Sequence, residues 1–208
     1  MTRLCVAFLS LFVFACAGPS KGEMTFPAAY YRSGEGPPPA VPSCTVPIQV
    51  VVTDARPTPS VVGRRFEEEK PTVEYPIKME GDAGAYVRNG VEKALLAADG
   101  APAGKAPANL AITITQIALE EKTFYNAEFS GRMGLEVILT RATSSEPCWS
   151  GRVSGLGRNY GKAGNPTNYQ ETLNRALDHA TSELLGAPGF ADAMCGKCSS
   201  PTQSQALR

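Results

Sequence analysis

The sequence predicts an α+β fold: a two-layer sandwich in which two helices cover one face of a mainly antiparallel sheet, in the order β-α-β-β-β-α. Two segments, residues 82–100 and 168–186, carry apolar residues at helical spacing along a single stripe. Four other segments carry apolar residues at alternate positions, which is typical of strands in a sheet with one polar face. Because each helix has one apolar stripe, both helices are expected on the same side of the sheet.

The first strand is expected at residues 46–53, where Val46, Ile48, Val50 and Val52 alternate with other side chains and a proline-containing stretch follows. Residues 58–81 then contain three prolines among mixed charges, so we expect a long loop there. The opposite charges of residues 64–69 are expected to neutralise one another in solvent.

The first helix is expected to begin at Asp82, a favourable N-cap residue, and to stop at Gly100. Strands at residues 110–119, 133–140 and 148–157 follow, and their short connections make them antiparallel neighbours. A change of alternation at Gln116 predicts a bulge. The glycines from Gly155 to Gly164 are expected to mark a flexible exit from the last strand.

The second helix is expected to have Asn168 as its N-cap and Glu171 as the capping-box partner. Its apolar stripe must lie on the sheet, because each fully buried leucine contributes roughly 1.5–3 kcal/mol. The stripe consists of Leu173, Ala176, Leu177, Ala180 and Leu184. Residues 44–190 are thus expected to form a single α+β domain, followed by a cysteine-containing C-terminal tail at 191–208.

Residues 1–15 have the features of an export signal peptide. Arg3 precedes an uncharged apolar core, which is shorter than the ~20 apolar residues needed to span a bilayer. The four residues ending at Cys16 resemble the bacterial lipobox, although Phe14 is larger than the residue usual there. This resemblance implies that Cys16 becomes the N-terminus and carries acyl chains such as palmitate, and more than one chain gives stable anchoring. Cleavage after Ala17 is the alternative, and it would give a soluble periplasmic or secreted protein.

Residues 16–43 are rich in proline, glycine and serine, so we expect a semi-extended, lipid-anchored tether. Ala17, and not an aspartate, follows Cys16. In lipoproteins of this kind that residue implies sorting to the outer membrane, with the domain facing the periplasm.

The chain contains six cysteines. Cys5 is removed with the signal peptide and Cys16 is the lipidation candidate. The other four are disulfide candidates in an oxidising compartment, and four cysteines allow three connectivities. Among these we favour Cys44–Cys148 with Cys195–Cys198, although the sequence does not choose between them.

The sequence predicts no catalytic residue, no metal site and no cofactor. Its 20 acidic and 20 basic residues balance, so nothing indicates a nucleic-acid partner. His179 is the only histidine and is expected on the surface. The spacing of Cys195 and Cys198 would suit a redox pair, so a periplasmic redox or hydrolytic enzyme is the alternative function.

Several stretches resemble the YajG-like family of bacterial outer-membrane lipoproteins. They are residues 50–57 followed by Gly63 and Arg65, the helix at 87–100, the strands at 109–114 and 134–139, and the last amphipathic helix. The resemblance covers roughly residues 46–187. It implies an outer-membrane lipoprotein without known catalysis, and auxiliary subunits of lipid-transport systems share this plan.

The sequence therefore predicts a non-catalytic envelope lipoprotein, anchored to the membrane through Cys16, that acts as a binding or assembly module. Its partner would be an envelope protein, a lipid or a glycan, bound through the open sheet face or the loop from residue 56 to residue 79. Asp54, Arg56 and Arg65 are the candidate contact residues. An auxiliary subunit of an envelope lipid-transport machine is a further alternative.

Overall fold

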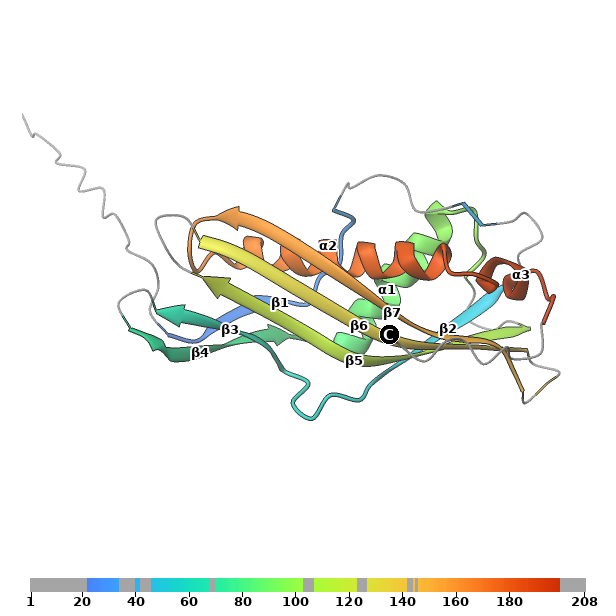
Figure 1. Ribbon diagram of the computed structural model, residues 1–208, viewed down its shortest axis with the longest axis horizontal. Helices are drawn as coiled ribbons and strands as arrows, with labels where there is room; N and C mark the ends of the chain where they lie inside the picture. Colours follow the sequence, from blue (N-terminus) through green and yellow to red (C-terminus); the bar gives the residue numbers. More distant parts are fainter. Residues whose placement is uncertain are drawn as a thin grey trace, which may run out of the picture.

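In the computed structural model of the protein, the described residues are 22–33, 40–41, 46–67, 70–102, 107–122, 127–141, 144 and 146–198. They form a seven-stranded sheet with its helices on one face, which is an α+β fold (Figure 1). The strand order is β1-β4-β3-β5-β6-β7, and β2 also pairs with β5. The core lies between the sheet and the helices.

The longest strands form the centre of the sheet: β5 (Ala108–Lys122), β6 (Ala127–Arg141) and β7 (Pro147–Gly161). They are antiparallel neighbours, as predicted. Along β5 and β6 nearly every second side chain is buried, because these residues face the helices. The predicted bulge is confirmed by a register shift between Ile114 and Gln116.

The predicted long loop at residues 58–81 is wrong, since this region forms β3 (Val61–Glu67) and β4 (Lys70–Glu80). The strands β3 and β4 pair as an antiparallel hairpin. Strand β2 (Ile48–Asp54) and β3 both run parallel to β5, along different parts of it. With β1 (Met24–Pro27) parallel to β4, the sheet is mixed, so the predicted order and pairing were too simple.

The expected tether at residues 16–43 also contains ordered structure, because β1 extends the edge of the sheet beside β4. Phe26 of β1 is buried and stacks on Tyr169. After β1, the hydroxyl of Tyr30 donates to Asp178 of the second long helix. The expected C-terminal tail likewise begins with a short helix, α3 (Phe190–Met194), whose two end residues are fully buried.

The helix α1 (Ala83–Ala97) begins as predicted: the Asp82 side chain accepts a hydrogen bond from Gly84 N at 2.7 Å. The helix α2 (Pro166–Leu185) begins at Asn165 and not at Asn168, because a proline at the first helical position favours a start there. Glu171 bonds to Asn159 Nδ2 at 2.7 Å and forms no capping box. The predicted apolar stripe of α2 is fully buried. None of the helices in the described ranges is long and apolar enough to span a membrane.

Glycines in β7 allow the backbone of α2 to lie directly on the strand. A Cβ atom on Gly155 would lie 1.8 Å from the carbonyl oxygen of Ala176, and one on Gly157 would lie 2.0 Å from that of Thr172. Larger residues would therefore overlap the helix backbone. The expected flexible exit after residue 154 is wrong, because β7 continues to Gly161 and these glycines belong to a helix contact.

Candidate functional site

The candidate contact residues Asp54 and Arg56 form an ion pair at the end of β2. Arg56 Nη2 lies 2.6 Å from Asp54 Oδ2, and the Arg56 side chain is 6% exposed. The same guanidinium donates to the carbonyl oxygens of Pro59 at 2.6 Å and Val61 at 3.3 Å. Burial acts to raise the pKa of Asp54, but the hydrogen bonds and charge of Arg56 outweigh it and lower that pKa. The pair therefore holds the connection between β2 and β3 in place.

The third candidate, Arg65, lies in the interior. Its Nε is 3.2 Å from Glu121 Oε2, and the two side chains are 6% and 0% exposed. The Tyr169 hydroxyl and the Gly164 N–H also donate to this carboxylate. Burial, together with the hydrogen bond and charge of Glu121, raises the pKa of Tyr169 above its usual value. Arg65 is thus part of a buried polar cluster, and the expectation that it lies in solvent is wrong.

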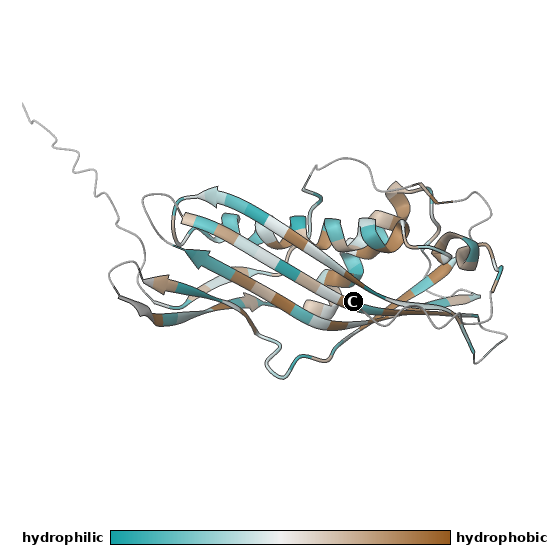
Figure 2. Ribbon diagram, in the orientation of Figure 1, coloured by the Kyte–Doolittle hydropathy of each residue, from teal (hydrophilic) through white to brown (hydrophobic). Residues whose placement is uncertain are grey.

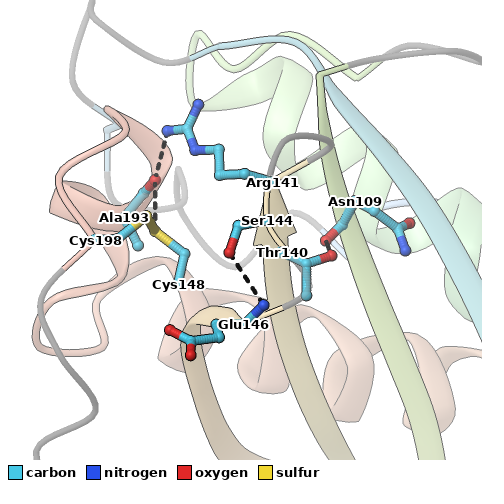
Figure 3. Close-up of a disulfide and its surroundings, with 8 residues drawn as sticks. All are labelled: Asn109, Thr140, Arg141, Ser144, Glu146, Cys148, Ala193 and Cys198. Carbon is cyan, nitrogen blue, oxygen red and sulfur yellow. Dashed lines mark hydrogen bonds between the residues drawn. A yellow bond between two sulfur atoms is a disulfide. The ribbon is translucent and has the colours of Figure 1, made fainter.

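The structure pairs Cys148 of β7 with Cys198, across a Cα–Cα distance of 4.6 Å (Figure 3). Cys195 is also disulfide-bonded, while Cys16 and Cys44 lie outside the described residues. The favoured pairings Cys44–Cys148 and Cys195–Cys198 are therefore both wrong. The reason is tertiary: α3 lies against β7, and Arg141 Nη2 at the end of β6 donates to the Ala193 carbonyl of α3 at 3.0 Å.

These disulfides remove the basis for a redox pair made of Cys195 and Cys198, since each sulfur is bonded elsewhere. His179 is exposed, as expected, and its Nδ1 accepts a hydrogen bond from Leu156 N at 3.3 Å on the edge of β7. Within the described ranges, no group of three or more histidine, cysteine or acidic residues could hold a metal ion.

The remaining candidate is the face of the sheet opposite the helices. In the described part of the chain, no helix covers this face, which Figure 1 shows from the front. Hydropathy alternates along β5 and β6 (Figure 2), so that one set of side chains faces the core and the other this open face. A groove of about 590 Å³ lies on the open face between the β3–β4 hairpin and the strands β5 and β6.

The groove is lined mainly by apolar surface, with charged and small side chains at its walls. Arg64 of β3 and Glu74 of β4 form an exposed ion pair of 3.2 Å at one wall. Arg132 of β6 lies at the other wall, beside Ser130, and forms no ion pair with any described residue. The alternation along β6 places Arg132 on the polar face, so the sequence contains a signal for this residue. Arg64 lies within a run of mixed charge, which gives no such signal. A free guanidinium of this kind binds carboxylate or phosphate groups through paired hydrogen bonds.

Comparison with solved structures finds a protein of similar fold. Protein XCC0632 from Xanthomonas campestris, which carries the family-model description DUF330, superposes with a TM-score of 0.56. The likeness covers 84% of this chain and 99% of that chain, at 15% sequence identity. The chain shares its fold with this protein. At this identity the likeness establishes the fold alone.

Two weaker likenesses have TM-scores too low to establish a shared fold. A candidate lipoprotein from Caulobacter crescentus gives 0.40, with 22% identity over 57% of this chain and 87% of that chain. PelC from Paraburkholderia phytofirmans, described as a dodecamer, gives 0.34, with 15% identity over 70% and 93%. No family model matches the sequence, and no curated protein is significantly similar to it. The resemblance to the YajG-like family therefore stays a prediction.

Proposed function

We propose that this chain is a non-catalytic lipoprotein of the bacterial envelope, held at the periplasmic side of the outer membrane by acyl chains on Cys16. The observation that carries the proposal is the Cys148–Cys198 disulfide in a chain that begins with an export leader. Disulfides persist in oxidising compartments such as the periplasm and are rare in the cytosol. The position of Cys16 directly after the leader supports lipid anchoring in that compartment.

Replacement of Cys16 by serine is expected to release the protein from the membrane fraction and to abolish labelling with fatty acid, because the acceptor thiol is lost. Membrane fractionation and mass spectrometry of the mature N-terminus measure both effects. Cys5→Ser is the matched control, since Cys5 is predicted to leave with the signal peptide. An unmodified mature chain beginning at Gly18 would contradict the proposal, as would a Cys16→Ser protein that stays membrane-bound.

We further propose that the domain is a binding or assembly module, and that a partner protein of the envelope occupies the groove on the open sheet face. The lining combines apolar, small and charged residues, as the surfaces of protein interfaces do, and Arg132 offers a charge that no described residue neutralises. Arginine is enriched among the residues that dominate the energy of protein interfaces. An acidic side chain or C-terminus on the partner would complement it.

Arg132→Glu is expected to reduce in-cell crosslinking to that partner about tenfold, which corresponds to a contact worth roughly 1.4 kcal/mol. The yield of the crosslinked, co-purified species measures the effect. Arg88→Glu is the matched control, because Arg88 is also exposed but lies on α1, on the other side of the sheet. Equal loss in both variants, or capture that Arg132→Glu leaves unchanged, would contradict a partner site in the groove. A lipid or glycan recovered in place of a protein would assign the groove to that class.

A further inference from the structure

The chain enters the domain at one particular end of the sheet. Strand β1 runs parallel to β4, and Met24 pairs with Ile77. The residues that precede Met24 in β1's direction therefore lie toward the end of the sheet where β3, β5 and β7 finish. This is the left end in Figure 1. We call this the entry end and define it by Phe66, Lys122, Glu128 and Tyr160, which pair in one row across four strands.

The distance from Cys16 to this end is short. Gly22 is the first described residue, so six Cα steps separate it from Cys16. At 3.3–3.6 Å per step, Gly22 can lie at most about 22 Å from the anchored residue. The 15 residues of β5 span about 50 Å, at ~3.4 Å per residue. If Cys16 is lipidated, as proposed above, the entry end is therefore held close to the bilayer and the opposite end is not.

The entry end exposes an aromatic ring between two cations. Tyr160 is 66% exposed, more than any other large apolar side chain of the described residues. Arg158 lies two residues before it on the same face of β7, and Lys162 follows the strand end. Both cations are exposed, and neither forms an ion pair within the described ranges. Glu128 lies opposite Tyr160 on β6, and Lys122 is 3.8 Å from Glu120.

This combination matches the chemistry of a membrane surface. Tyrosine is enriched at the membrane–water interface, where its ring lies at headgroup level and its hydroxyl reaches water. Arginine and lysine beside it gain from the negative potential of anionic lipids. We propose that the entry end docks on the membrane in which Cys16 is anchored, with Tyr160 at headgroup level and with Arg158 and Lys162 on lipid phosphates. The proposal rests on the lipid anchor proposed above.

Quenching of tryptophan fluorescence by brominated lipid tests this orientation in the full, lipidated chain. The chain has one tryptophan, Trp149, which is eleven residues from Tyr160 along β7, or about 37 Å at ~3.4 Å per residue. Trp149 thus reports on the far end. A Tyr160→Trp variant adds a second reporter at an exposed position, where folding is not at risk. The proteins are placed in vesicles of phosphatidylglycerol and phosphatidylcholine with brominated acyl chains.

We expect the emission added by Tyr160→Trp to fall by about half or more in brominated vesicles, since interfacial side chains lie about 5–10 Å into the headgroup and acyl boundary. The emission of Trp149 in the unsubstituted protein should not change. Adding Arg158→Glu and Lys162→Glu should restore the added emission without releasing the protein.

Vesicle flotation separates the two proposals. A protein that does not float refutes the lipid anchor, whereas a Tyr160→Trp protein that floats and whose added emission is not quenched overturns the docking of the entry end.

Discussion

Gly155→Ala is expected to lower the free energy of unfolding by about 3 kcal/mol or more, which is at the upper end of the cost of overpacking a core. The added Cβ would lie 1.8 Å from the Ala176 carbonyl oxygen and 2.6 Å from the Ala180 backbone nitrogen. Both atoms belong to the backbone of α2, which cannot move aside as a flexible side chain can. The whole helix must shift away from β7, and its buried stripe loses contact with the sheet.

Urea unfolding followed by Trp149 fluorescence measures this loss. Ser154→Ala is the matched control, because Ser154 is the preceding residue, is exposed and points to the open face. Such a surface change is expected to stay within about 0.5 kcal/mol of the parent protein. Gly157→Ala should behave like Gly155→Ala, since its Cβ would meet the Thr172 carbonyl oxygen. Native stability in both glycine variants would show that α2 does not lie on β7 as closely as described.

Arg65→Met is expected to cost about 3–5 kcal/mol, which is typical when one partner of a buried ion pair is removed. The Glu121 side chain is 0% exposed. Without the guanidinium, its carboxylate would lose the cation that compensates for its removal from water. Unfolding in urea, compared at one pH, measures the difference.

The double variant Arg65→Met with Glu121→Gln separates a charge effect from a packing effect. Glutamine is neutral and keeps a carbonyl oxygen that can accept from Tyr169 and Gly164. We therefore expect the double variant to regain much of the stability lost in Arg65→Met. If instead the loss in the double variant equals the sum of the losses in the single variants Arg65→Met and Glu121→Gln, the ion pair between these residues is not what stabilises this part of the core.

The sequence predicted the central part of the fold because its patterns are strong there. The stripe of α2 and the alternation of β5 and β6 each bury one face and leave the other polar, so the pattern alone identifies helix and strand. The strands β1, β3 and β4 were missed, since prolines occur in β1 and β4 and charges of both signs occur in β3 and β4. Prolines and charges argue against a strand when only the local sequence is considered. One signal was available: Val73, Tyr75, Ile77 and Met79 alternate along β4.

For the candidate site, the alternation of β6 places Arg132 on the polar face, and the run of opposite charges at residues 64–69 predicts that Arg65 lies in solvent. The structure buries Arg65 instead, and its neighbours are the reason. The neighbour of Arg65 on β5 is Glu121, beneath α2, because β3 runs parallel to β5 in that register. Nothing in the local pattern of residues 61–67 specifies this pairing.

The sequence by itself determined the helical stripes and the alternation of the long strands, and it predicts an export leader with Cys16 directly after it. All of these are local properties, set by residues a few positions apart. Only the tertiary structure decided that Cys148 pairs with Cys198, 50 residues away, and Arg65 with Glu121, 56 residues away. It also decided that Gly155 and Gly157 lie under a helix. Such contacts depend on which elements become neighbours when the core closes, and that depends on the packing of the whole chain.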